Sequence, residues 1–365
     1  MSKKVIISGG GTGGHIYPAI AIANALQRRE PDLEVLFVGA LGKMEMEKVP
    51  RAGYNIVGLP IAGIKRAISI DNLALPFKLL NSLLKAKAII KDFKPDVAVG
   101  VGGFASGPLL MMASLAEIPT LIQEQNSYAG ITNKFLGKKA SKICVAYPGM
   151  EAFFPKEKIA LLGNPVRSDI VDVSLKKKEA LTEFGLDPEK TTLFVMGGSL
   201  GAKSINESID AGLERLTNAG YQVLWQTGRN YIDTAQASIA RIGTKQVKAF
   251  DFIYTMDLAY AMADVVVSRA GALSVSELCL AAKPSILVPF PAASEDHQTK
   301  NALTLVEQDA ALLIKDSNAK DDLVTRALEL LGNIEQQENL KVNIRKLARP
   351  GAADDIAAEV LKLIR

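Results

Sequence analysis

With 365 residues, of which 48% are hydrophobic and 22% charged, the chain is long enough for two globular domains that each bury a core. Two cysteines and two histidines are too few for a structural zinc site, and neither a signal peptide nor a membrane-spanning helix is expected. The net charge of +4 is uneven, because residues 1–163 carry 20 basic and 12 acidic side chains and the rest carry 23 and 27. An anionic partner is therefore expected on the N-terminal half. Cys144 and Cys279 lie among apolar residues, which predicts buried, reduced thiols.

In the first half, apolar β-branched runs alternate with stretches of helical period. Because the apolar runs are continuous and are separated by helices, they predict a parallel sheet that is covered on both faces. The predicted strands are 4–8, 34–38, 55–59, 97–101, 120–124 and 142–145, and the predicted helices are 14–29, 72–92, 107–116 and 130–137.

The second half repeats this pattern. Its predicted strands are 191–196, 222–226, 246–249, 264–267, 285–288 and 311–314, and its predicted helices are 202–217, 231–241, 255–262, 274–282, 297–307, 321–332, 335–346 and 352–364.

Gly163-Asn164-Pro165-Val166-Arg167 has the composition of a linker between the two halves. We therefore expect an α/β protein of two doubly wound, Rossmann-like domains facing each other across a cleft. Residues 1–163 and 164–345 are the expected domains, and 346–365 are expected to pack back on the first. Ligands of such sheets bind at the carboxyl ends of the strands, which here indicates the cleft.

The first glycine-rich stretch, Ser8-Gly9-Gly10-Gly11-Thr12-Gly13-Gly14-His15, lies between a predicted strand and helix, where backbone N–H groups can hold a phosphate. Gly9-x-Gly11-x-x-Gly14 matches the dinucleotide fingerprint, but the second strand ends Val38-Gly39-Ala40 without the carboxylate that this fingerprint requires. The nucleoside-triphosphate loop is excluded as well, because His15 stands where it needs lysine. A tight turn alone needs fewer small residues, so we expect a diphosphate or a sugar to approach this loop.

Two other glycine clusters follow predicted strands. The amides of Gly197-Gly198-Ser199-Leu200-Gly201-Ala202 and the Ser199 hydroxyl can hold a phosphate oxygen. Gly100-Val101-Gly102-Gly103-Phe104 closes the fourth strand and is expected to widen the crevice of the first domain.

The stretch from Ser268 to Glu277 also follows a predicted strand and is rich in small residues. Ser274 has the position of a helix N-cap with Glu277 three residues on, so one interpretation of Glu277 is a capping-box carboxylate. The other is an acceptor for the two hydroxyls of a ribose. The sequence leaves both open.

The two histidines, His15 and His297, both fall just after predicted strand ends in loop-to-helix passages. His297 could be a surface histidine only. Nevertheless, this shared placement favours a functional role for both.

Together and in order, these motifs resemble the MurG family of the GT-B superfamily, bacterial transferases that move N-acetylglucosamine from UDP-GlcNAc to lipid I and form lipid II. The resemblance spans roughly residues 4–345. The matching motifs are Gly10-Gly11-Thr12-Gly13-Gly14-His15, Gly102-Gly103-Phe104, Glu124-Gln125-Asn126, Gly163-Asn164-Pro165-Val166-Arg167, Gly197-Gly198-Ser199-x-Gly201-Ala202, Ser268-Arg269-Ala270-Gly271-Ala272 and Asp296-His297-Gln298-x-x-Asn301-Ala302.

The resemblance implies a GT-B fold, with the acceptor and the membrane on the N-terminal domain and the UDP-sugar held mainly by the C-terminal domain. Leu200 departs from the pattern, since many members carry Gln there. The donor contacts implied are Thr12, Gly13 and Gly14 at sugar and diphosphate, Asn126 at the sugar, Arg167 and Ser199 at the diphosphate, Ile253 at uracil through its backbone, Ala272, Leu273 and Ser274 around nucleotide and diphosphate, Glu277 at the ribose, and Gln298 at the sugar hydroxyls.

The implied reaction inverts the anomeric centre as the C4 hydroxyl of the acceptor's MurNAc attacks and UDP leaves. His15 is the candidate general base, because imidazole can take a proton near pH 7. The alternative is that His15 only orients donor or acceptor by hydrogen bonding. The chain has no Asp-x-Asp motif, so no metal and no cofactor are expected, and turnover should persist in EDTA.

The expected partners are UDP-GlcNAc, lipid I and an anionic membrane surface, without nucleic acid, at the cytoplasmic face of the inner membrane. Residues 64–94 mix basic and apolar side chains, and Leu75-Pro76-Phe77-Lys78 could enter the interface of an anionic leaflet. The plainer interpretation is an amphipathic helix with a solvated lysine face. For the function as a whole, the alternatives are a GT-B transferase with another acceptor such as diacylglycerol, a UDP-sugar epimerase, or a non-catalytic nucleotide-binding protein.

Overall fold

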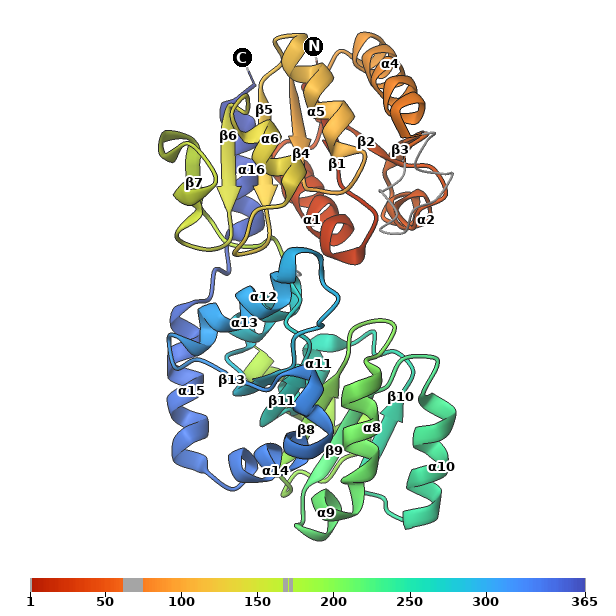
Figure 1. Cartoon of the computed structure of the whole chain (residues 1–365), viewed down its shortest axis with the longest axis vertical. Helices are drawn as coiled ribbons and strands as arrows, with labels where there is room; N and C mark the ends of the chain where they lie inside the picture. The colour runs from red at the N-terminus through yellow and green to blue at the C-terminus, as the bar shows by residue number, and fades with distance from the viewer. Residues whose placement is uncertain (1, 62–74, 167–169, 171–172, 365) are drawn as a thin grey trace. The chain divides into compact units, whose positions relative to one another are not determined.

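The computed structural model describes residues 2–61, 75–166, 170 and 173–364. The chain forms two compact units, the first of Met1–Val166 with Gly351–Arg365 and the second of Arg167–Pro350. The boundaries between the two units thus fall after residues 166 and 350, whereas the boundaries expected from the sequence fall after residues 163 and 345. Each unit is an α/β domain built on one parallel sheet (Figure 1).

Unit 1 has a seven-stranded sheet in the order β3-β2-β1-β4-β5-β6-β7. Among the described residues, all of its strand pairs are parallel. Its strands are β1 (Lys4–Ser8), β2 (Glu34–Ala40), β3 (Asn55–Leu59), β4 (Val97–Gly100), β5 (Thr120–Glu124), β6 (Lys142–Val145) and β7 (Ile159–Leu161). Its helices are α1 (Gly13–Arg29), α2 (Glu45–Arg51), α4 (Leu75–Phe93), α5 (Ser106–Leu115), α6 (Ile131–Gly137) and α16 (Ala352–Lys362), with short 3₁₀ helices η1 (Met150–Ala152) and η2 (Lys156–Lys158).

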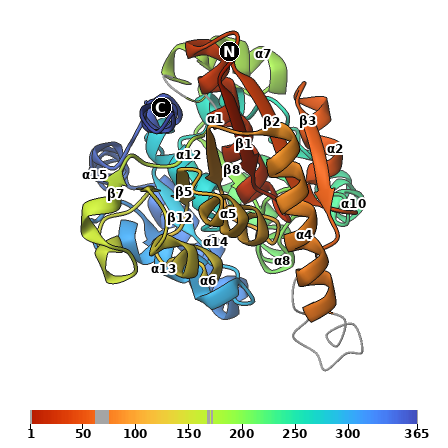
Figure 2. The same cartoon turned by 90° about the horizontal axis from the view of Figure 1, so that it is seen from above.

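The strands of unit 1 are buried on both faces, as their continuous apolar sequences predict. Val5 and Ile7 of β1 pack in one cluster with α1 and with Ile356 of α16. Ile6 points to the opposite cluster, which includes residues of α4, α5 and α6. Helices α4 and α5 pack against each other (Figure 2). The C-terminal helix therefore completes one of the two layers that cover this sheet.

Unit 2 has a six-stranded parallel sheet in the order β10-β9-β8-β11-β12-β13. Its strands are β8 (Thr192–Met196), β9 (Gln222–Gln226), β10 (Val247–Phe250), β11 (Val265–Ser268), β12 (Ser285–Leu287) and β13 (Leu312–Leu313). Its helices are α7 (Lys177–Phe184), α8 (Lys203–Ala211), α9 (Leu213–Asn218), α10 (Ile232–Ile242), α11 (Met256–Met262), α12 (Ala272–Ala281), α13 (His297–Val306), α14 (Ala319–Leu331) and α15 (Ile334–Lys346), with 3₁₀ helices η4 (Val173–Lys176), η5 (Ser294–Asp296) and η6 (Asp316–Asn318).

The prediction of one helix over 202–217 is wrong, because the structure has α8 and α9 on either side of Gly212. A Cβ on Gly212 would lie 2.5 Å from a methyl carbon of Val324, so α14 approaches the backbone where only glycine fits. Glycine is also unfavourable inside a helix, which explains why the helix is interrupted there. Three short elements, α2, α7 and β7, were not predicted from the sequence.

In each unit the strand order reverses beside the first strand. In unit 1 this switch point lies between β1 and β4, and in unit 2 it lies between β8 and β11. The three glycine-rich loops found in the sequence follow β1, β4 and β8, and the stretch of small residues from Ser268 follows β11. Such a switch point is where doubly wound sheets bind ligands, so the topology places the loops at the expected site of each unit.

Candidate active site

In unit 1, the loops after β1 and β4 pack on each other. The Gly10 amide donates to the Gly102 carbonyl at 3.3 Å, and the Ser106 hydroxyl donates to the Ser8 and Gly102 carbonyls at 3.0 and 2.8 Å. Gly103 has φ +89°, and a Cβ there would lie 2.3 Å from the Gly10 carbonyl oxygen. Part of the glycine content therefore serves the contact between the two loops and needs no ligand to explain it.

Glu45 is a buried carboxylate that holds the first loop. It lies in the first turn of α2, is 1% exposed, and accepts hydrogen bonds from the amides of Gly11 (2.9 Å) and Ala40 (3.0 Å). A Cβ on Gly10 would lie 2.2 Å from its carboxylate, so the loop closes directly over this side chain. The second strand has no carboxylate at its end, but one five residues further on folds back onto the loop. Because it binds loop amides, it is not placed to bind a ribose.

Three of the predicted donor contacts of unit 1, Thr12, Gly13 and Gly14, lie where this loop enters α1. Thr12 is the N-cap residue, Gly13 and Gly14 form the first turn, and the Thr12 carbonyl accepts from the His15 amide at 3.1 Å. The Thr12 side chain makes no capping bond, and no acidic residue occupies the first turn. The positive end of the helix is therefore not neutralised by its own side chains, which favours an anion or a polar sugar there.

The imidazole of His15 is held in place by the loops that follow β4 and β5. Its Nδ1 lies 3.0 Å from Oε1 of Gln125, which follows β5. A Cβ on Gly102 would lie 2.6 Å from the same nitrogen, so the ring rests against the Gly102 backbone. The structure thus brings the candidate base into contact with the loops after β4 and β5.

Glu124 organises the loop that carries Asn126. It is 2% exposed, and its carboxylate accepts from the Asn126 amide (3.1 Å) and side chain (3.3 Å), from the Gly130 amide (3.0 Å) and from the Asn133 side chain (2.8 Å). This carboxylate therefore orients Asn126, the predicted sugar contact. The sequence signal for this role is that Glu124 ends a predicted strand two residues before Asn126.

In unit 2, the loop from Gly197 to Ala202 packs against the end of β9. Gly201 has φ +77°, and a Cβ there would lie 2.0 Å from the Thr227 carbonyl oxygen. The Gln226 side chain donates to the Gly198 carbonyl at 3.2 Å and accepts from the Ile253 amide at 2.9 Å. Gln226 thus joins this loop to the segment predicted to contact uracil. The Ile253 amide already donates to Gln226. In this arrangement the backbone group of Ile253 that can contact uracil is therefore its carbonyl.

Ser199 and Leu200 lie at the exposed tip of the same loop. The predicted contact of Ser199 with the diphosphate is compatible with this exposure and stays a prediction. Leu200 is exposed too, so its departure from the family pattern costs the fold no buried contact. Arg167, the other predicted diphosphate contact, lies outside the described residues.

Helix α12 begins at Ala272, with Gly271 as its N-cap, so the interpretation of Ser274 and Glu277 as a capping box is wrong. The small residues 270–272 allow the helix to start two residues before the predicted position. The half-buried Glu277 accepts a hydrogen bond from the Tyr260 hydroxyl at 3.1 Å. With the capping role removed, the prediction that Glu277 binds a ribose remains, as do those for Ala272, Leu273 and Ser274.

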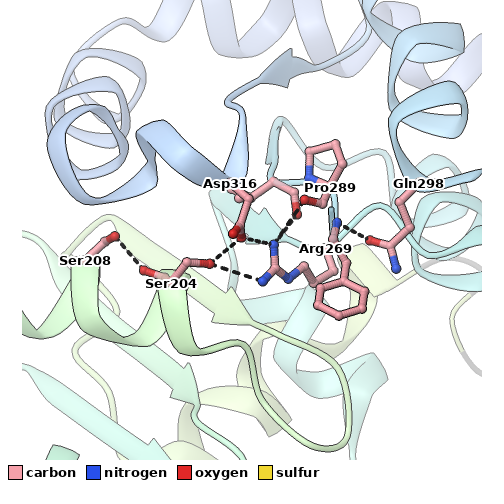
Figure 3. Close-up of polar contacts among 8 residues, drawn as sticks. Ser204, Ser208, Arg269, Pro289, Gln298 and Asp316 are labelled. Carbon is pink, nitrogen blue, oxygen red and sulfur yellow. Dashed lines mark hydrogen bonds and ion pairs between the residues drawn. The ribbon is translucent and has the colours of Figure 1, made fainter. Parts of the chain in front are cut away.

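Arg269 joins its own loop to the start of α8, to η6 and to the loop after β12, at the carboxyl edge of the unit 2 sheet (Figure 3). Its guanidinium pairs with Asp316, donates to Ser204 at 3.1 Å and to the carbonyls of Val288 and Pro289 at 3.0 and 3.2 Å. The side chain is 11% exposed. Its bonds are thus made to the protein itself, and they hold the start of α8 next to the loop that follows β12.

The loop after β12 carries two strained residues. Glu295 and Asp296 both have φ in the left-handed region, at 50° and 56°, which costs free energy for side chains with a Cβ. They precede His297, whose Nε2 lies 3.6 Å from a carboxylate oxygen of Glu295, and Gln298, whose side-chain oxygen accepts from the Phe290 amide at 2.9 Å. Strained backbone at such a position is typical of a functional loop. The sugar contact of Gln298 stays a prediction.

Each unit therefore presents helix N-termini and hydrogen-bonding side chains at its switch point, an arrangement suited to a phosphorylated sugar or nucleotide. Among the described residues, no group of three or more His, Cys, Asp or Glu is placed to hold a metal ion.

Two family models match the chain. The glycosyltransferase family 28 N-terminal domain matches residues 5–145, and the glycosyltransferase family 28 C-terminal domain matches residues 192–356. A protein of Cytophaga hutchinsonii named UDP-N-acetylglucosamine--N-acetylmuramyl-(pentapeptide) pyrophosphoryl-undecaprenol N-acetylglucosamine transferase is 58% identical over 361 residues, which are 99% of this chain and 97% of that protein.

A solved structure of a related protein indicates the same family. The crystal structure of Acinetobacter baumannii MurG matches with a TM-score of 0.82 and 31% identity, over 99% of both chains. The UDP-GlcNAc 2-epimerase of Neisseria meningitidis matches with a TM-score of 0.69 over 99% of this chain and all of that one, but at 15% identity this shows a shared fold alone. With both family 28 domains matched and such identity over almost its whole length, this chain belongs to glycosyltransferase family 28 and, within it, to the MurG family of GT-B N-acetylglucosamine transferases.

Proposed function

We propose that this glycosyltransferase moves N-acetylglucosamine from UDP-GlcNAc to the C4 hydroxyl of MurNAc in undecaprenyl-pyrophosphoryl-MurNAc-pentapeptide, with inversion at the anomeric carbon. The observation that carries the proposal is the 58% identity, over 99% of the chain, to a protein named for this transfer. Peptidoglycan precursor synthesis follows from that activity. Another lipid-linked acceptor is the main alternative.

The donor is assigned to unit 2. Helices α8 and α12 begin beside its switch point, where their N-termini can stabilise the charge that builds on the diphosphate as UDP leaves. Glu277 and Gln298 lie in the first two turns of α12 and α13, so they are candidates for the ribose and the sugar hydroxyls. Ile253 offers its carbonyl to uracil.

The acceptor hydroxyl is assigned to unit 1. Its oxygen becomes more positive as it bonds to the anomeric carbon, and its proton becomes more acidic, so a base that takes the proton lowers the barrier, typically by roughly 10²–10⁴-fold in rate. His15 is the candidate, since Gln125 and Gly102 fix its ring at the carboxyl edge of the sheet. His15→Ala should therefore lose at least about 10²-fold in kcat while the protein remains folded. Activity within a few-fold of the wild type would exclude this role.

Membrane attachment is assigned to α4. None of the helices in the described part of the chain has the length and apolar character that crossing a bilayer requires. Phe77, Leu80 and Leu84 lie along one stripe of α4 and are 76%, 56% and 60% exposed, while Ser82, Ala86 and Ile90 are buried toward the rest of the unit. The exposed face of α4 thus carries large apolar side chains as well as lysines. A lysine face that only contacts water would not need these apolar side chains. A peripheral position on an anionic cytoplasmic leaflet follows.

Residues 64–74 of the basic stretch 64–94, with the basic Lys65 and Arg66 and the acidic Asp71, lie outside the described residues. The membrane assignment can be tested on α4 alone, by neutralising Lys78, Lys85 and Lys87 to Gln and measuring sedimentation with anionic vesicles. Binding should fall, whereas the same change at three exposed lysines of unit 2 should leave it intact. Unchanged binding after the α4 substitutions would place the membrane surface elsewhere. The control positions are Lys203, Lys320 and Lys341.

A single assay separates the candidate functions. UDP release from UDP-GlcNAc is measured with and without a lipid I analogue, in EDTA and in magnesium. Release that requires the lipid I analogue and persists in EDTA supports the proposed transfer. Release without any acceptor indicates an epimerase, and release only with a diacylglycerol acceptor indicates a different glycolipid transferase.

A further inference from the structure

The side chain of Gln125 has a defined orientation. It is 1% exposed, and its Nε2 donates to the Val101 carbonyl at 2.7 Å and to the Gln123 carbonyl at 3.2 Å. Carbonyl oxygens can only accept, so the atom that faces them must be the NH₂ group. The amide oxygen of Gln125 is consequently the atom that faces His15.

A second layer of buried amides fixes this arrangement. Nε2 of Gln125 also donates to Oε1 of Gln123, whose own Nε2 donates to Oδ1 of Asn164 at 3.0 Å. Asn164 in turn donates to the Gln125 carbonyl at 3.0 Å. Gln123 and Asn164 are 0% and 2% exposed. Reversing any one of these amides would set donor against donor or acceptor against acceptor, which is costly away from water.

An amide oxygen cannot donate, so the 3.0 Å contact between Gln125 Oε1 and His15 Nδ1 requires the proton to be on Nδ1. In a neutral imidazole the other nitrogen, Nε2, then carries the lone pair. The Gly102 backbone lies against the Nδ1–Cε1 edge of the ring, and turning the ring over would put a carbon in place of Nδ1 and lose the bond to Gln125. The ring and its tautomer are thus both defined by residues of other loops.

We propose that Gln125 is a positioning residue, which holds His15 in the Nδ1–H tautomer so that Nε2 is the nitrogen that takes the proton of the attacking hydroxyl. The part about proton transfer rests on the general-base role proposed for His15, whereas the tautomer does not. As the hydroxyl oxygen bonds to the anomeric carbon and the bond to the UDP oxygen breaks, the hydroxyl proton passes to Nε2. The imidazolium keeps its Nδ1–H bond to Gln125.

The neutral amide suits this task. A carboxylate at the same place would stabilise the imidazolium before the reaction and reduce the fraction of neutral base. The amide of Gln125 orients the ring and adds no charge.

The tautomer can be measured directly, because the chain has only two histidines. With ¹⁵N-labelled histidine, two-bond ¹H–¹⁵N correlation spectra show which ring nitrogen carries the proton, and the variant His297→Asn assigns the two sets of signals. Wild-type His15 in its neutral form is expected with the proton on Nδ1. A wild-type His15 with the proton on Nε2 would overturn the proposal, whatever the activity.

Gln125→Leu removes the acceptor, and Asn164→Leu is the matched control, since it disturbs the same buried network and leaves the Gln125 side chain in place. Gln125→Leu should move His15 toward the Nε2–H tautomer. It should also lower kcat by at least about tenfold, with little change in KM for UDP-GlcNAc. The largest loss expected is the roughly 10²–10⁴-fold that a general base supplies. Asn164→Leu should keep the Nδ1–H tautomer. An unchanged tautomer in Gln125→Leu, or an equal shift in both variants, would overturn the proposal.

The two proposals fail separately. An active His15→Ala protein would remove the base, and the wild-type spectrum would still report the tautomer. An inactive His15→Ala protein with the proton on Nε2 would leave the proposed function standing and refute the role of Gln125.

Discussion

Glu45→Gln tests whether a buried carboxylate holds the loop that carries His15. In the wild type, two charge-assisted hydrogen bonds join its two oxygens to the amides of Gly11 and Ala40. Each such bond contributes about 1.5–3 kcal/mol. The Gln side chain keeps one oxygen that accepts a neutral hydrogen bond of about half the strength. Its NH₂ group faces the other backbone amide, so the second hydrogen bond is lost. The expected loss is about 3 kcal/mol, which corresponds to roughly 100-fold in a local opening equilibrium.

Amide hydrogen exchange measures this opening. Protection of the Gly11 and Ala40 amides should fall by about 100-fold, and kcat should fall by at least about tenfold, because Thr12 to His15 shift with the loop. Glu47→Gln is the control: Glu47 lies on the same helix, is exposed, and pairs only with Lys48 and Arg51 among the described residues. Protection within about threefold of the wild type in Glu47→Gln is expected. The same result in Glu45→Gln would refute the reasoning.

Three further predictions concern buried side chains. Asp316→Asn leaves the buried Arg269 guanidinium without its partner charge, which typically costs about 3–5 kcal/mol, so the unfolding free energy should fall and KM for UDP-GlcNAc should rise. The double variant Arg269→Met/Asp316→Leu should be more stable than either single variant in urea unfolding, and additive losses would contradict a direct coupling. Burial raises the pKa of the Cys144 and Cys279 thiols to about 12, so alkylation should follow local opening of units 1 and 2 respectively. UDP at about 100 times its Kd should slow labelling of Cys279 by up to about 100-fold and that of Cys144 much less, and the reverse would place the nucleotide in unit 1. Burial lowers the pKa of Lys283 from 10.5 to about 8, so the folded state binds this proton less tightly than the unfolded state. The unfolding free energy should therefore gain from this group as pH rises from about 8 to 10.5, and the advantage of Lys283→Met over the wild type should shrink over that window. A constant difference would contradict the shift.

The alternation of strands and helices could be predicted because it depends on local pattern. Apolar β-branched runs such as Val5–Ile7 are buried on both faces wherever they occur in a doubly wound sheet. The prediction failed where packing overrides local propensity. At Gly212 the approach of α14 interrupts a helix that the sequence pattern continues.

The location of the candidate site could also be predicted, because ligands of parallel sheets bind where strands end. The loops after β1, β4 and β8 could be found from their glycines, and the loop after β11 from its small residues. Their internal contacts could not be predicted in the same way. Glu45 follows β2 by five residues in a helix that the sequence did not indicate, so its return to Gly11 was missed.

The sequence by itself determined the two sheets, the loops at their carboxyl ends and the family. Only the tertiary structure decided which side chains of those loops contact one another. Arg269 and Asp316 are 47 residues apart, and His15 and Gln125 are 110 apart. Such pairs meet because the sheet order brings strands that are distant in sequence close together: β1 and β5 flank β4, and β11 and β13 flank β12. Sequence periodicity carries no record of that order, so the orientation of Gln125, and with it the tautomer of His15, could be derived only from the folded chain.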